Sequence, residues 1–100
     1  MGLLNNLFGS KTDFQALVND GAIILDVRSR GEYARGHAKG AINIPVNELG
    51  GRIEELRKKD KPIITCCASG MRSGSAKSLL KSRGLEAYNG GPWQKVDGLK

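Results

Sequence analysis

The sequence predicts a three-layer α/β domain, with helices on both faces of a mainly parallel central sheet of four to five strands. Short apolar runs alternate along the chain with segments of helical spacing, which is the order of a parallel sheet with crossover helices. The runs at 22–28 and 62–67 contain few polar residues, as is typical of strands buried on both faces. Of 100 residues, 39% are hydrophobic, enough for one core. We therefore expect a loose leader at residues 1–10 and a single domain at residues 11–100.

Capping patterns predict where the first two helices begin. Thr12 is followed three residues later by Gln15, and Ser29 by Glu32, which is the spacing of a capping box. Gly21 suits the end of the first helix. Further strands are expected at 41–44 and 85–88, and further helices at 47–59 (with Asn47 as its cap), at 73–83 and from residue 90 onward.

The composition excludes several classes of function. Lys and Arg number 16 against 10 Asp and Glu, a net charge of +6 that suits small anionic substrates. The basic residues are dispersed and not interleaved with aromatic side chains, so we expect no nucleic-acid partner. We also expect no membrane span, because no apolar run is long enough, and no signal peptide. Cys66 and Cys67 are the only cysteines and form no disulfide framework, which indicates the cytoplasm.

Three candidate functional residues lie at the carboxyl ends of predicted strands. Asp26, Arg28 and Cys67 each lie at the carboxyl end of an apolar run. Ligands of parallel sheets bind beyond these ends, so we expect the three to share one crevice.

The segment from Cys67 to Ser73 has the composition of a nucleophile loop. Cys67 lies between a buried strand and a helix, where the unpaired amides and the helix dipole favour negative charge. Arg72 adds a positive charge, and both effects lower a thiol pKa. Gly70 allows the loop to curl, so that its N–H groups form an anion cradle around the sulfur. We expect Cys67 to be the nucleophile and Cys66 to be a buried structural residue.

Two loop registers compete at the cysteine doublet. Counting from Cys67 to Arg72 gives a six-residue loop, whose small ring of amides suits the terminal sulfur of a persulfide. Counting from Cys66 gives the seven-residue loop of cysteine phosphatases, which encloses phosphate. Thr65 stands where those phosphatases usually have His, and the loop holds no acidic general acid. The Cys67 register is therefore preferred.

Four motifs, taken together and in this order, resemble those of the rhodanese family, in particular its small single-domain members. They cover about residues 12–98. They are Asp26-Val-Arg28 with Glu32-Tyr33, the run Gly36-His37-Ala-Lys-Gly40-Ala-Ile-Asn-Ile-Pro45, the loop Cys67-x-x-Gly70-x-Arg72-Ser73, and Gly90-Gly91 before Trp93, at a shorter spacing than the family's.

The resemblance implies a rhodanese-like fold and a thiosulfate sulfurtransferase that works without metal or organic cofactor. Cys67 would take a sulfur from a small anionic donor such as thiosulfate, hold it as a persulfide, and pass it to cyanide or a thiol, with a thioredoxin-like protein among the acceptors. Cys67 and Arg72 would be catalytic. The residues that would bind substrate are Ala68, Ser69, Gly70, Met71 and Ser73.

The same resemblance gives the remaining motif residues supporting roles. Asp26 and Arg28 would form a charge pair that braces loops near the site. His37 would hydrogen-bond to the backbone and lock its loop, and Trp93 would act as a lid or pack in the core. Two alternatives remain: a phosphatase or arsenate reductase that uses Cys66, and a sulfur-relay module that acts on a protein partner.

Overall fold

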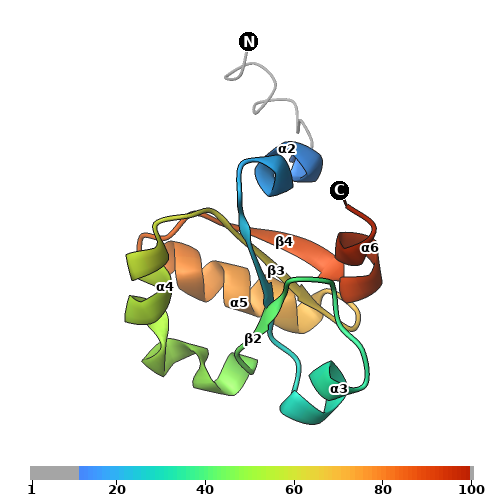
Figure 1. The fold of residues 1–100 in the computed structure, drawn as a ribbon. Coiled ribbons are helices and arrows are strands. Elements are labelled where there is room, and N and C mark those ends of the chain that lie inside the picture. Colours follow the sequence, from blue (N-terminus) through green and yellow to red (C-terminus); the bar gives the residue numbers. More distant parts are fainter. Residues whose placement is uncertain (1–11, 100) are drawn as a thin grey trace.

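The computed structural model describes residues 12–99, so the predicted leader at 1–10 lies outside the described residues. Within them the chain forms one four-stranded sheet, and every pair of neighbouring strands is parallel (Figure 1). The order across the sheet is β2-β1-β3-β4, and the strands are β1 (Ile23–Asp26), β2 (Ile42–Asn43), β3 (Ile63–Cys67) and β4 (Ala87–Pro92). The predicted parallel α/β architecture is confirmed.

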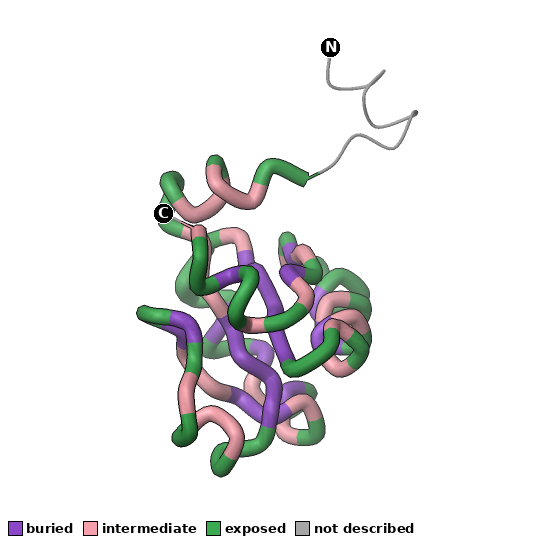
Figure 2. Tube along the Cα trace, turned by 90° about the vertical axis from the view of Figure 1, so that its right-hand side faces the viewer, coloured by how far each residue is buried: buried purple, intermediate pink, exposed green. Residues whose placement is uncertain are grey.

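Helices cover both faces of the sheet, and the sheet separates the hydrophobic core into two clusters. On one face the core is formed with α4 (Ile53–Lys59), α5 (Met71–Ser82) and the 3₁₀ helix η1 (Val46–Gly51). On the other face it is formed with α2 (Phe14–Asn19), α3 (Arg30–Ala34) and α6 (Trp93–Asp97). Figure 2 shows the buried residues gathered along the central strands, and all of β3 is buried. No helix among residues 12–99 is long and apolar enough to cross a bilayer.

The side chains of β3 alternate between the two clusters because successive strand residues point to opposite faces. Ile63 and Cys67 belong to the cluster beneath α5, whereas Ile64 and Cys66 belong to the cluster beneath α2 and α6. The two adjacent cysteines are therefore separated by the sheet itself.

One of the two predicted capping boxes is present. Ser29 accepts from the Glu32 amide while Glu32 accepts from the Ser29 amide, so the box that opens α3 is confirmed. The predicted cap at Thr12 is wrong, because Asp13 precedes α2 and its carboxylate accepts from the Ala16 amide at 3.0 Å. Asp13 takes the capping position that Thr12 would need.

The helix predicted over 47–59 is divided in two. Asn47 lies inside the 3₁₀ helix η1, and α4 begins only at Ile53, after Arg52 has left helical geometry with a φ of −120°. Gly50 and Gly51 fall at the division, where their backbone entropy disfavours a continuous α-helix.

Boundaries around the loop after β3 also differ from the expected ones. Helix α5 begins at Met71, two residues before the expected start, because Gly70 adopts a φ of 103° as its cap. Strand β4 continues to Pro92, and a register shift opposite β3 places Pro92 beside Cys67. The Gly90-Gly91 pair, expected in a helix start, is therefore part of the strand that flanks the loop.

Gly90 lies where α6 packs closely on the sheet. A Cβ at this position would be 2.6 Å from Val96 Cγ2 and 2.7 Å from Ile64 Cγ2, distances that real Cβ atoms do not adopt. The glycine at this position of the Gly90-Gly91 motif is therefore required by packing, because only glycine lets β4 approach both Val96 and Ile64.

We expect Gly90→Ala to lower the free energy of unfolding by about 1–3 kcal/mol, the usual cost of overpacking a core. Gly50→Ala is the matched control, since a Cβ at Gly50 would meet no atom within 4 Å. Denaturant unfolding followed by circular dichroism measures both variants. Equal stability of the two would contradict the packing argument.

Candidate active site

Cys67 ends β3, and the short loop 68–70 connects it directly to the first turn of α5. Its side chain is completely buried. The sulfur accepts from the amides of Gly70 at 3.0 Å and Ser73 at 3.4 Å, and the Ser73 hydroxyl oxygen lies 3.3 Å away. Of the predicted substrate-binding residues, Gly70 and Ser73 therefore contact the sulfur most closely, whereas the side chains of Ala68, Ser69 and Met71 are exposed to solvent.

The loop is built to hold a thiolate. Burial raises the pKa of Cys67, but hydrogen bonds from the hydroxyl and amide of Ser73 and from the amides of Gly70 and Ser69 outweigh it. The net effect places the pKa of Cys67 below its ordinary value. Because the sulfur also faces the amino end of α5, the helix dipole acts in the same direction.

Cys66 has the opposite environment. Burial and the nearby charge of Asp26 raise the pKa of the Cys66 thiol to about 12. The side chain lies in the core cluster on the other face of the sheet, away from the loop. A neutral, enclosed thiol is a poor nucleophile, which favours the Cys67 register over the phosphatase register.

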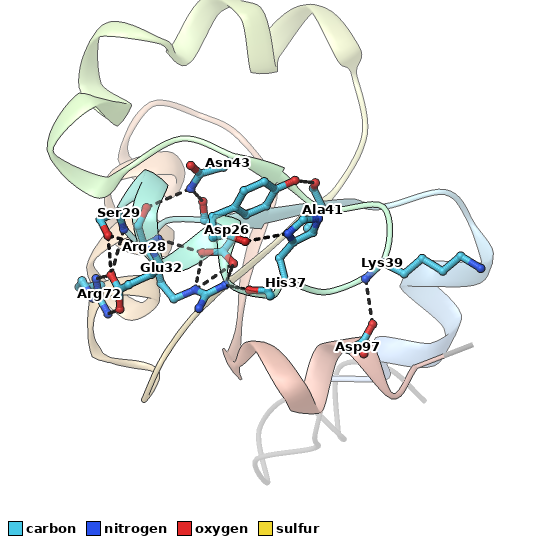
Figure 3. Close-up of polar contacts among 12 residues, drawn as sticks. Asp26, Arg28, Ser29, Glu32, His37, Lys39, Ala41, Asn43, Arg72 and Asp97 are labelled. Carbon is cyan, nitrogen blue, oxygen red and sulfur yellow. Dashed lines mark hydrogen bonds and ion pairs between the residues drawn. The ribbon is translucent and has the colours of Figure 1, made fainter.

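Arg72 is held by Glu32 rather than directed at the sulfur. Its two terminal nitrogens donate to the two carboxylate oxygens of Glu32 at 2.7 and 3.0 Å (Figure 3). Glu32 is the same residue that caps α3 through Ser29, so one carboxylate joins α3 to the active loop. A cavity of about 300 Å³ borders Arg72 and is lined also by Val27, Arg30, Val46 and Glu48.

The Glu32–Arg72 pair predicts a pH dependence. Hydrogen bonds from Arg72 and from the Ser29 amide lower the pKa of Glu32 from 4.5 to about 2. Because the pKa in the folded state lies below that in the unfolded state, the pair stabilises the fold above about pH 4.5 and this contribution is lost as the pH falls toward 2. NMR titration of the Glu32 carboxyl measures this pKa. In Arg72→Met the midpoint should move up toward the ordinary value, and an unaltered midpoint would contradict the assignment.

Asp26 and Arg28 form a buried ion pair at the carboxyl end of β1. The guanidinium donates to the Asp26 carboxylate at 2.6 to 3.0 Å and to the Gly36 carbonyl at 2.7 Å (Figure 3). It also lies 5.0 Å from the centre of the Trp93 ring. Asn43 donates to both backbone carbonyls of the pair's residues. The pair thereby joins β1, β2, the 36–40 loop and α6 beside the site.

His37 belongs to the scaffold. Its Nδ1 lies 2.9 Å from the Tyr33 carbonyl oxygen, and its ring stacks on the Tyr33 ring with centroids 3.7 Å apart. The Tyr33 hydroxyl donates to the Ala41 carbonyl, which closes the loop. This arrangement agrees with the loop-locking role expected for His37.

Sequence reasoning missed two polar residues behind the loop. Asn89 accepts from the Ser73 hydroxyl at 2.7 Å and donates to the Gly70 carbonyl at 3.0 Å. Thr65, fully buried, donates to the Ser73 carbonyl at 2.8 Å. Only the place of Asn89 directly before Gly90-Gly91 could have drawn attention to it. Among residues 12–99 no three His, Cys, Asp or Glu side chains gather as a metal site would require.

Comparison with known proteins assigns the family. The Rhodanese-like domain profile matches residues 10–92, most of the chain. The chain belongs to the rhodanese family. Its four parallel strands are those of the rhodanese fold, and the domain is related to sulfurtransferases.

Two similar solved structures have nearly the same extent as this chain. A rhodanese from E. coli solved with anions is 30% identical, with a TM-score of 0.71, over 80% of this chain and 95% of its own. The human single-domain sulfurtransferase TSTD1 is 30% identical, with a TM-score of 0.66, over 88% of this chain and 93% of its own. Among curated sequences, the uncharacterized protein YqhL of Bacillus subtilis is 42% identical over 69 residues, which cover 68% of this chain and 54% of YqhL. This rhodanese-like chain thus spans about half the length of that relative.

Proposed function

We propose that this protein is a thiosulfate sulfurtransferase that moves a sulfane sulfur from thiosulfate, or from a persulfide donor, to cyanide or a thiol through a persulfide on Cys67. The observation that carries the proposal is the convergence of the Gly70 and Ser73 donors on one buried sulfur at the start of α5. Both cysteines are free, which fits the reducing cytoplasm expected from the sequence.

The chemistry divides into two displacements. The Cys67 thiolate attacks the outer sulfur of thiosulfate, forming a new S–S bond while the old one breaks and sulfite leaves with its electron pair. The acceptor, cyanide or a thiolate, then attacks the outer sulfur of the persulfide, and Cys67 leaves as the thiolate. The loop amides stabilise the negative sulfur at both stages, so neither step needs a metal or cofactor. Because Cys67 is fully buried, this proposal requires the loop 68–70 to open when each reactant enters.

Arg72 binds the donor from the rim of the site in this proposal. A guanidinium has five N–H donors, and the pair with Glu32 uses two of them. In this proposal the remaining donors bind the sulfonate end of thiosulfate. The loop residues 68–71 and Ser73 supply the backbone around the transferred sulfur, and Asp26 with Arg28 supports them from β1.

A sulfur relay to a protein is a second candidate, because Met71 is 80% exposed in the active loop. It is the large apolar side chain that residues 12–99 leave most open to solvent. An apolar group beside the nucleophile gives a protein acceptor, such as a thioredoxin-like protein with a reactive cysteine, a point of contact. The chemistry at Cys67 is the same, and only the acceptor differs.

Mass spectrometry after incubation with thiosulfate tests the proposal. We expect the protein to gain one sulfur atom, localised to the peptide that contains Cys67, and to lose it on addition of cyanide. Met71→Ser separates the two candidates, since it should slow transfer to a protein acceptor while leaving transfer to cyanide unchanged. A chain that takes up no sulfur from thiosulfate or from any persulfide donor would refute the proposal.

A further inference from the structure

The orientation of the Asn89 side chain is determined by two backbone groups. The Gly91 amide, which can only donate, lies 2.9 Å from Oδ1, and the Gly70 carbonyl, which can only accept, lies 3.0 Å from Nδ2. Rotating the amide by half a turn would place donor against donor and acceptor against acceptor. Oδ1 therefore faces the Ser73 hydroxyl, 2.7 Å away.

Ser73 has a single hydroxyl proton and two neighbours that compete for it. One is Asn89 Oδ1, which can only accept, and the other is the Cys67 sulfur at 3.3 Å. When the proton points to Asn89, the Ser73 oxygen turns its lone pairs to the sulfur, which suits a neutral S–H donor. When the proton points to the sulfur, it stabilises a thiolate. Ser73 Oγ and Asn89 Oδ1, 2.7 Å apart, then face each other without a proton between them, which is unfavourable.

We propose that Asn89 is a positioning residue that controls the direction of the Ser73 hydroxyl and, through it, the charge on Cys67. When Cys67 is neutral, its thiol donates a hydrogen bond to the Ser73 hydroxyl oxygen, and the Ser73 hydroxyl donates to Asn89 Oδ1. When Cys67 loses its proton to solvent, the Ser73 hydroxyl rotates to the sulfur and Asn89 keeps its bond from Gly91. Each thiolate therefore forms at the expense of the Ser73–Asn89 hydrogen bond. The inference deepens the proposed function and rests on Cys67 being the sulfur carrier.

The same rotation acts in each half of the reaction. The thiolate that attacks the donor, and that leaves when the acceptor takes the sulfur, is held by the rotated hydroxyl. When the sulfur is neutral, the Ser73 hydroxyl again donates its hydrogen bond to Asn89 Oδ1. Ser73 is fully buried, so no bulk water competes for its proton in the described structure. Thr65 holds the Ser73 carbonyl, so the hydroxyl rotates while the backbone stays in place.

Other charges around Cys67 remain constant when Asn89 is changed. These titratable and charged groups belong to α5, α3, β3 and the end of β1. Each is either in an ion pair or neutral, and none of them contacts Asn89. They are Arg72 with its partner Glu32, Asp26 with its partner Arg28, and the Cys66 thiol.

A double-mutant titration tests the proposal. NMR of Cβ-labelled cysteine follows the protonation of Cys67 directly, with the resonance assigned from its loss in Cys67→Ser. Asn89→Ala removes the acceptor, and any water that replaces it can donate as readily as accept. We expect the pKa of Cys67 to fall, with about a tenfold rise in the ratio of thiolate to thiol at a fixed pH. Asn89→Ser should act in the same direction, and circular dichroism verifies that both variants fold.

The Ser73→Ala background provides the control. Without the hydroxyl, Asn89→Ala should leave the pKa of Cys67 unchanged. A shift of equal size in both backgrounds would mean that Asn89 only supports the loop through Gly70, and an unchanged or raised pKa with Ser73 present would equally overturn the proposal. The titration uses no sulfur donor, so its outcome is independent of the sulfur uptake that tests the proposed function.

Discussion

Cys67→Ser should abolish sulfur uptake from thiosulfate and bring cyanide-dependent turnover to the uncatalysed background. A serine hydroxyl in this loop has a far higher pKa than a thiol and cannot form a persulfide. Mass spectrometry measures the uptake, and thiocyanate formation measures the turnover.

Cys66→Ser is the matched control. The neighbouring sulfur lies in the other core cluster with a pKa raised to about 12, so its replacement should preserve the sulfur uptake and affect mainly stability. If Cys66→Ser abolished activity while Cys67→Ser retained it, the nucleophile would be assigned to the wrong cysteine.

Asp26→Ala should produce the largest loss of stability of any single change considered for this protein. The variant leaves the buried Arg28 guanidinium without its carboxylate, and breaking a buried pair in this way costs about 3–5 kcal/mol. Chemical denaturation measures the free energy of unfolding. Glu54→Ala, which breaks the exposed pair with Arg57, is the control and should change stability little.

A second readout separates bracing from catalysis at Asp26. If the pair only supports the site, the folded fraction of Asp26→Ala at low temperature should take up sulfur at close to the normal rate per folded molecule. Full stability of the variant would contradict the bracing role. Normal stability with lost sulfur transfer would assign Asp26 to the chemistry itself.

Hydrophobic patterning in the sequence was sufficient to predict the sheet. The apolar runs that contain Ile23–Asp26 and Ile63–Cys67 are buried strands, because a parallel strand covered on both faces consists mostly of apolar residues. The Ser29–Glu32 capping box was also predictable, since both partners lie within one helical turn. Boundaries were less predictable where glycines at 50, 51 and 70 permit more than one backbone conformation.

Residue identity in the sequence was enough to propose a candidate site, but the geometry of that site could be predicted only in part. A cysteine between an apolar strand and a helix, followed by Gly70 and Arg72, was enough to propose Cys67 as the nucleophile. The partner of Arg72 was not predictable, because Glu32 is 40 residues away in sequence and meets it only through the docking of α3 on the loop. Asn89 was missed for the same reason, since β4 reaches the loop only across the assembled sheet.

Cys67 illustrates what the sequence determines and what the tertiary structure determines. The sequence by itself determined the alternation of strands and helices, the loop that follows β3 and the residue types within it, because these depend on local periodicity and spacing. Only the tertiary structure decided which of the two cysteines faces the loop amides and which faces the opposite core. The physical reason is that a thiol's pKa depends on burial and on donors brought together from β3, α5 and β4, and these contacts exist only in the folded chain.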